Sequence, residues 1–246
     1  MSAVVRPSEQ IYENYTQEDF AVWKTLYNRQ SELLQKFASQ EFLSALKLID
    51  FTSDKIPDFK RIKAALQPLT GWQLETVPNI SEQKEFFQFL SEKKFTATCW
   101  LRKMEQLDYL EEPDMFHDVF GHVPLLSNKA YTSFFEAISH IAIEYIDNPK
   151  VIELLGRVYW FTIEFGLIRE NDKLRIYGAG IISSSAETEN CLSDATAKHD
   201  FNVNQILNTS FRTDVTQDKY FVIESYEQLY ESIPEIRIQL QKNLSA

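Results

Sequence analysis

Glycine is scarce in this chain, at 6 of 246 residues. Nucleotide-binding folds built on glycine-rich turns, and β-sandwiches with many tight turns, need more of it. The hydrophobic content of 44%, with 18 Phe, 11 Tyr and 4 Trp, nevertheless supplies a large core. No linker composition interrupts the chain, so we expect one domain dominated by helices.

Cysteine, basic residues and long apolar runs are also in short supply. Cys99 and Cys191 lie far apart and frame neither a disulfide scaffold nor a Cys-x-x-Cys zinc site, which is typical of a reducing compartment. The formal charge of -11 argues against nucleic acid as a partner, because a phosphate backbone is bound through clustered Lys and Arg. No apolar run reaches roughly 18 residues and residues 1–7 hold no signal-peptide core, so we expect a cytoplasmic protein without a membrane segment.

Apolar residues recur with helical periodicity over much of the chain. Thr16 is placed to cap a long amphipathic helix that reaches Phe37. Asn148 followed by Pro149 is a typical helix start, and Ser81 and Ser127 are the expected caps of two others. Further helices are predicted over residues 42–49, 57–66, 81–90, 127–145, 149–167, 202–207 and 224–246, and strands over 72–77, 95–101, 174–182 and 220–223.

Two of the four histidines, His117 and His122, lie five positions apart. On an unbroken α-helix, side chains at that spacing point about 140° away from each other. Gly121 relaxes the backbone, and Pro124 disfavours a helical conformation at Val123. We therefore expect the helix to stop between the histidines and the chain to bend, so that both reach one metal ion. The alternative is a pair of hydrogen-bonded polar residues at a helix end.

Two imidazoles leave a divalent ion short of ligands, and a carboxylate is the usual third ligand of an open catalytic site. Asp114, Asp118 and Glu164 qualify by type. Glu164 stands out because residues 158–167 otherwise hold only apolar, aromatic and small side chains. An unneutralised charge there costs on the order of several kcal/mol. An arginine partner would also neutralise it, and the donor set alone does not separate zinc from iron.

Three segments together resemble the pterin-dependent aromatic amino acid hydroxylases. They are PDMFHDVFGHVP at 113–124, YWFTIEFGL at 159–167, and YGAGIISS at 177–184 followed by Glu187. The resemblance covers about residues 72–226, whereas the first 70 residues match loosely and are expected to form a helical N-terminal part. It implies a mainly α (α+β), multihelical catalytic domain with a small β-sheet, spanning residues 1–246. No regulatory or tetramerisation domain is expected, and hence a monomer.

The resemblance also implies a role for each site residue. Arg102 corresponds to an arginine that holds the substrate carboxylate, and a planar guanidinium suits bidentate recognition of that group. Asp114 is expected to orient Arg102. No catalytic side chain beyond the metal ligands is implied. The remaining implied roles are Fe(II) ligation by His117, His122 and Glu164, support of His117 by Ser183, an aromatic pocket lined by Pro113, Trp160 and Gly180, and pterin contacts from Phe86, Asp118 and Tyr159.

The implied activity is the Fe(II)- and tetrahydropterin-dependent hydroxylation of L-phenylalanine to L-tyrosine with O2, a reaction of phenylalanine catabolism. The pterin would be tetrahydrobiopterin or a similar compound. Leu110 and Glu111 stand where animal members have threonine and proline, so a substrate contact there is not expected to carry over. The alternatives are hydroxylation of another ring position or of tryptophan, a non-catalytic module that binds an aromatic amino acid, and, more distantly, a hydrolytic zinc enzyme.

Overall fold

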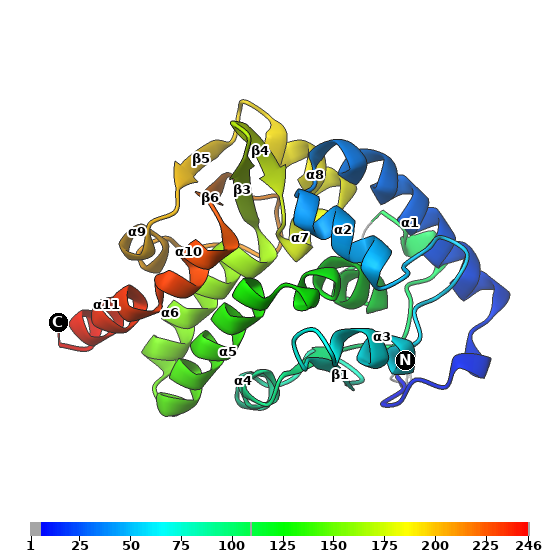
Figure 1. Cartoon of the computed structure of the whole chain (residues 1–246), viewed down its shortest axis with the longest axis horizontal. Coiled ribbons are helices and arrows are strands. Elements are labelled where there is room, and N and C mark those ends of the chain that lie inside the picture. Colours follow the sequence, from blue (N-terminus) through cyan, green and yellow to red (C-terminus); the bar gives the residue numbers. More distant parts are fainter. Residues whose placement is uncertain (1–5, 109, 246) are drawn as a thin grey trace.

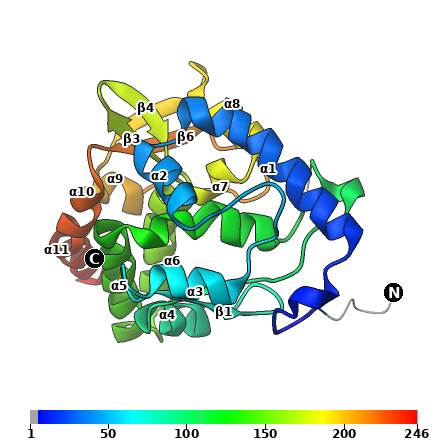
Figure 2. The same cartoon turned by 45° about the vertical axis from the view of Figure 1, so that its right-hand side comes forward.

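A computed structural model describes residues 6–108 and 110–245, in which helices surround two small sheets (Figures 1 and 2). The predicted mainly α (α+β) class is confirmed. Residues 1–5, which belong to the segment searched for a signal peptide, lie outside the described residues. Within the ranges described, no helix combines the length and apolarity needed to cross a membrane.

The N-terminal part is helical, as predicted. Helix α1 (Gln17–Phe37) starts at a capping box in which the Thr16 hydroxyl accepts from the Asp19 N–H and the Asp19 carboxylate accepts from the Thr16 N–H. Helices α2 (Gln40–Leu48) and α3 (Phe59–Leu66) follow. The inner face of α1 presents Trp23, whose ring packs edge-on against Phe116 and Phe120 of the metal-capable segment.

The sheets lie in different parts of the molecule (Figure 1). Strands β1 (Gln73–Thr76) and β2 (Lys94–Ala97) are parallel, and α4 (Gln83–Ser91) crosses between them. The larger sheet has the order β4-β3-β6-β5, with β3 antiparallel to β4 and parallel to β6. Its strands are β3 (Gly166–Glu170), β4 (Lys173–Ile176), β5 (Ala197–Asp200) and β6 (Lys219–Ile223).

Helices α5 and α6 lie side by side and extend from the centre to the lower edge of the molecule, and α10 and α11 pack beside them (Figure 1). The predicted cap at Asn148 is confirmed, since its side chain accepts from the Val151 N–H. The remaining helices are α5 (Lys129–Glu144), α6 (Pro149–Tyr159), α7 (Ala179–Ile182), α8 (Ser185–Leu192), α9 (Val203–Leu207), α10 (Tyr226–Glu231) and α11 (Ile233–Ser245).

Some predicted element boundaries are wrong. The caps of α4 and α5 are Glu82 and Asn128, one residue after the serines expected. The strand predicted over 174–182 ends at Ile176, and α7 follows. The physical reason lies at Gly178, where a Cβ would stand 2.4 Å from the Glu164 carbonyl oxygen. The missing side chain lets the chain turn against that backbone and start a helix.

Candidate metal centre and substrate cavity

Both segments that carry metal-capable side chains are π-helices, η3 (Phe116–His122) and η5 (Trp160–Glu164), the second continuing directly from α6. A π-helix pairs the carbonyl of residue i with the N–H of residue i+5, as at the end of η5, where the Phe165 N–H donates to Trp160 at 2.9 Å. Residues five apart therefore lie on one face. The expected stop between the two histidines is wrong, because the helix widens instead of breaking.

Gly121 and Pro124 also act differently from the expectation. A Cβ on Gly121 would lie 3.0 Å from the Ala179 carbonyl oxygen, so the glycine allows α7 to pack directly against η3. Val123 keeps helical dihedral angles, φ -62° and ψ -38°. Pro124 then occupies the first position of a short 3-10 helix (Pro124–Ser127), where its missing N–H is tolerated.

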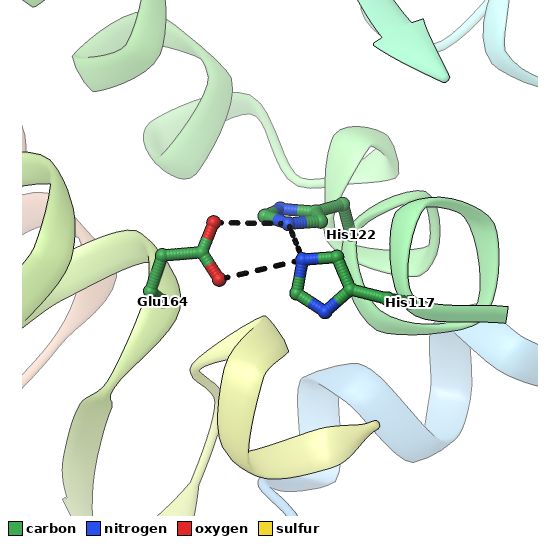
Figure 3. Close-up of side chains that lie close together, drawn as sticks. All are labelled: His117, His122 and Glu164. Carbon is green, nitrogen blue, oxygen red and sulfur yellow. Dashed lines mark hydrogen bonds and ion pairs between the residues drawn. The ribbon is translucent and has the colours of Figure 1, made fainter. Parts of the chain in front are cut away.

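His117, His122 and Glu164 converge on one point (Figure 3). The two Nε2 atoms are 3.4 Å apart. The Glu164 carboxylate lies 3.2 Å from His122 Nε2 and 3.7 Å from His117 Nε2. One donor atom from each residue fits within a span of 4.8 Å. Of the three carboxylates that qualified by type, Glu164 is the one that the fold brings to the histidines.

The electrostatics of Glu164 favour a bound cation. The residue is 9% exposed, and burial alone would raise the pKa of its carboxyl. The neighbouring His122, with a smaller contribution from His117, outweighs burial and lowers the pKa to about 2. The alternative of an arginine partner is wrong, since the nitrogen groups that lie within 4 Å of the Glu164 carboxylate in the described part of the chain are those of the two histidines. The carboxylate is ionised at neutral pH and is available as a ligand.

Ser183 lies beside His117, as the family resemblance implies. Its hydroxyl donates to the Ala179 carbonyl at 2.9 Å and lies 2.9 Å from His117 Nδ1. Since the single hydroxyl proton is used on the carbonyl, Nδ1 must carry the proton that joins the two side chains. The lone pair of His117 is then on Nε2, the atom that faces Glu164.

Arg102, which is partly buried, forms a bidentate pair with the buried Asp114. Nε and Nη2 of Arg102 donate to the two carboxylate oxygens of Asp114, each at 2.9 Å. The same carboxylate accepts the backbone N–H groups of Phe116 and His117 at 3.1 and 3.3 Å. Asp114 therefore orients Arg102, as expected, and also ties the arginine to the start of η3. Nη1 also donates to the Leu107 carbonyl at 3.5 Å, so one N–H of Nη1 and one of Nη2 remain for a carboxylate.

Both Arg102 and the metal-capable triad line a cavity of about 820 Å³. Phe86 on α4 lies on the same wall as Tyr159, with ring centres 5.5 Å apart. Asp118 lies nearby, and its carboxylate accepts the backbone N–H and the hydroxyl of Thr98 at 2.7 and 2.9 Å. Burial raises the pKa of Asp118. The three residues assigned to the pterin are thus brought to one cavity.

Pro113, Trp160 and Gly180, the residues expected to form the aromatic pocket, line the same cavity. A Cβ on Gly180 would stand 2.7 Å from the Phe165 ring, so only glycine allows α7 to approach that ring. The Trp160 ring lies 4.5 Å from the same Phe165. Every residue assigned to the site from the sequence therefore borders one cavity or, as with Asp114, supports a residue that does.

Some cavity residues were missed from the sequence. The Phe95 ring lies 4.7 Å from the His122 imidazole and covers one side of it. Thr98, which holds Asp118, follows β2, and no spacing marks it. Phe211 and Gln217 come from the segment between α9 and β6, which shows no periodic pattern. Only the aromatic character of Phe95 and Phe211 offered a signal, and such residues are usually core.

Comparison with known proteins agrees with this geometry. A sequence profile of the biopterin-dependent aromatic amino acid hydroxylases matches residues 5–246. The chain belongs to this family. It is 42% identical over 225 residues to the phenylalanine-4-hydroxylase of Ralstonia nicotianae, covering 91% of this chain and 72% of the relative. The phenylalanine-4-hydroxylase of Chromobacterium violaceum is 42% identical over 221 residues, covering 89% and 74%.

Solved hydroxylase structures share the fold. Phenylalanine hydroxylase from C. violaceum with bound oxidised Fe(III) superposes with a TM-score of 0.91 and 40% identity, covering 98% of this chain and 87% of that one. The same enzyme with iron(III) and 7,8-dihydrobiopterin gives a TM-score of 0.89 at 40% identity, covering 97% and 87%. Family membership and fold therefore agree for almost the whole length, including the N-terminal helices.

The side chains present fit the iron of this hydroxylase family. Nitrogen ligands about 2.1 Å from a common ion stand roughly 3.0 to 3.4 Å apart at angles between a right angle and a tetrahedral angle. The two Nε2 atoms are 3.4 Å apart, and the ionised Glu164 completes one face of a coordination sphere. Two histidines and one carboxylate with the opposite face open is the donor set of non-haem Fe(II) oxygenases.

Proposed function

We propose that this protein is an Fe(II)- and tetrahydropterin-dependent monooxygenase that converts L-phenylalanine to L-tyrosine with O2. The observation that carries the proposal is the convergence of His117, His122 and Glu164 in the lining of a cavity that is also lined by Arg102, held by the buried Asp114. Membership of the hydroxylase family and the similarity to two phenylalanine-4-hydroxylases support phenylalanine as the substrate.

The metal ligands in this proposal are His117, His122 and Glu164. Iron and the reduced pterin together supply the activation of O2 and the electrons that the hydroxylation consumes. The open side of the triad faces the cavity and leaves iron positions free for small molecules. Ser183 holds His117 in the tautomer that presents Nε2 to the metal.

The substrate is held at both ends. Arg102 binds the amino acid carboxylate through the remaining N–H groups of Nη1 and Nη2, and Asp114 keeps the guanidinium from turning. Pro113, Trp160 and Gly180 surround the aromatic ring. The distance between clamp and pocket sets which ring carbon faces the metal, so the protein's contribution is orientation and exclusion of water.

The pterin occupies the part of the cavity bordered by Phe86, Tyr159 and Asp118 in this proposal. Phe86 offers a half-buried aromatic face on which a flat heterocycle can stack. Burial raises the pKa of the Tyr159 hydroxyl well above its usual value, so it stays a neutral donor. The native pterin is tetrahydrobiopterin or a close analogue.

The test is aerobic incubation of the purified protein with Fe(II), tetrahydropterin and L-phenylalanine, with chromatographic analysis of the products. We expect tyrosine in proportion to the pterin oxidised. Hydroxylation at another ring position, or faster turnover of tryptophan, would replace the substrate assignment. Phenylalanine binding without any product would indicate a binding module, and hydrolysis by a zinc-only preparation would indicate a different enzyme class.

We also expect a monomeric, cytoplasmic protein. The two cysteines, Cys99 and Cys191, are free and buried, in keeping with a reducing compartment. Light scattering during size-exclusion chromatography tests the oligomeric state. A dimer at micromolar concentration would contradict this expectation without affecting the assigned activity.

A further inference from the structure

Glu187 completes the third sequence motif, yet the site described above gives it no role. It lies on α8 and is 7% exposed. Its Oε1 accepts the backbone N–H of Gln217 at 2.9 Å, and its Oε2 accepts the Tyr220 hydroxyl at 2.6 Å. A buried carboxyl is thus used to hold the segment 208–218, which connects α9 to β6.

Gln217 is the buried residue in a stretch, 212–218, whose other members are exposed. Its side-chain Nε2 donates to the carbonyls of Arg212 and Val215 at 2.9 and 3.0 Å. The amide oxygen must then face the opposite way, where it accepts the indole N–H of Trp160 at 2.9 Å. Asn190 donates to the Gln217 carbonyl at 2.7 Å. Each polar atom of Gln217 is therefore bonded, and its side chain has one orientation.

Trp160 is consequently fixed on three sides. The Phe211 ring stacks on it with centres 4.3 Å apart and planes 13° from parallel. Phe165 lies against it at 4.5 Å, and Gln217 takes the only hydrogen-bond donor of the indole. An indole with both a ring stack and a fixed N–H cannot change rotamer without losing one of them. Trp160, Phe211 and Gln217 all border the cavity.

We propose that Gln217 is a positioning residue and Phe211 a specificity-determining residue of the aromatic-ring pocket. Together they fix the Trp160 indole, so the segment 208–218, anchored through Glu187, decides which aromatic ring fits beside the metal centre. The proposal deepens the phenylalanine hydroxylase function and rests on it. It assigns a task to Glu187 and to a segment that contributes no side chain to the metal.

The main test is Gln217→Leu, which removes both hydrogen-bonding functions at similar volume. We expect the KM for phenylalanine, and its Kd measured by calorimetry on iron-loaded enzyme without pterin, to rise about tenfold, as loss of one buried hydrogen bond and of the fixed indole implies. Iron content and kcat stay within about twofold. The ratio of kcat/KM for phenylalanine to that for tryptophan falls about tenfold, because the loosened indole admits a larger ring.

Gln205→Leu is the matched control. Gln205 is exposed on α9, a few residues before the same segment. Its backbone N–H donates to the Asn202 side chain and its carbonyl accepts from Asn208 and Thr209, and a change of side chain leaves these backbone bonds in place. This variant leaves KM, Kd and selectivity unchanged. Phe211→Leu is a second route that does not disturb the buried amide, and it lowers the selectivity ratio to a similar extent.

A double-mutant cycle shows whether Gln217 acts through the indole. Trp160→Phe removes the N–H, so adding Gln217→Leu in that background raises the Kd for phenylalanine less than threefold. A full tenfold rise in both backgrounds would overturn the proposal. So would Gln217→Leu and Phe211→Leu enzymes that lose thermal stability and kcat while KM and selectivity stay constant. Wild-type protein that binds phenylalanine without hydroxylating it contradicts the assigned function alone, and the calorimetric cycle then still decides this proposal.

Discussion

The two walls of the cavity are built in different ways. The metal wall consists of His117, His122 and Glu164, carried on two π-helices inside the core. The second wall, which we propose binds the substrate and call the substrate wall, consists of Arg102 and the segment 208–218, which lie outside regular helices and strands and are held by side-chain hydrogen bonds. One wall takes its geometry from the backbone, whereas the other takes it from a few polar side chains.

This difference predicts how the protein responds to substitution. Changes on the metal wall remove the metal and therefore all chemistry. Changes on the substrate wall leave the metal in place and alter the affinity and choice of substrate. Iron content measured beside KM separates the two outcomes in every variant below.

The largest effect is expected from Glu164→Ala, or equally His117→Ala. Two ligands hold iron poorly, so iron content falls to background and tyrosine formation drops at least about a thousandfold. Far-ultraviolet circular dichroism stays unchanged. Glu153→Ala on α6, an exposed glutamate paired with Arg157, is the matched control with normal iron. A Glu164→Ala protein with full iron and turnover would remove the basis of the assignment.

Arg102→Lys tests the substrate wall. An ammonium cannot make the bidentate contacts to Asp114 and to a substrate carboxylate at once, so kcat/KM for phenylalanine falls about a hundredfold. Iron content stays normal. Arg237→Lys, at the exposed bidentate pair with Glu144, serves as control and leaves kinetics unchanged. Loss of iron in Arg102→Lys would show that the two walls are not separable.

Ser183→Ala weakens the metal wall without removing a ligand. His117 Nδ1 loses its partner, and the imidazole is free to rotate and to change tautomer. We expect iron affinity to fall about tenfold, measured by anaerobic titration, with kcat of the iron-saturated enzyme reduced less. Ser127→Ala, whose hydroxyl only bonds the Pro124 carbonyl, should leave the titration unchanged.

The smallest effect concerns pH. Burial raises the pKa of the Glu187 carboxyl in the folded state above the ordinary value of 4.5, which it keeps in the unfolded state. Between the unfolded-state pKa and the folded-state pKa, the folded protein therefore binds more protons than the unfolded protein. Stability therefore falls as pH rises through that window. Glu187→Gln removes this contribution, and its urea unfolding free energy should decline less than that of the wild type as the pH rises above 4.5. Parallel curves would show that the carboxyl does not titrate there.

Much of the metal wall could be predicted from the sequence because its signals are local. Glu164 is a single charge in an apolar stretch, and a buried charge requires a partner. The caps Thr16 and Asn148 likewise act within three residues. The π-helices were not predicted, because the periodicity of apolar residues indicates which face of a helix is buried but does not distinguish the i→i+5 hydrogen bonds of a π-helix from the i→i+4 bonds of an α-helix.

The substrate wall was harder to predict. The side chain of Gln217 forms hydrogen bonds with two backbone carbonyls and with the indole of Trp160, 57 positions earlier. No residue spacing in the sequence indicates these hydrogen bonds. Gly121 was read as a flexible point, although its task is to admit Ala179, a contact that only the fold creates. Family resemblance supplied Arg102, whose buried partner Asp114 is 12 positions away.

Because η3 is a π-helix, the number of residues between His117 and His122 is constrained. Deleting one residue between His117 and His122 would give a spacing of four, which an ordinary α-helix accommodates on one face. The histidines could still meet, but the start of the helix would turn by about 100° relative to its end. Asp114 would then swing away from Arg102. We therefore expect that an insertion or deletion between His117 and His122 impairs the protein even when the two histidines can still bind one metal ion. The reason is that the same helical segment positions the metal ligands and, through Asp114, the guanidinium of Arg102.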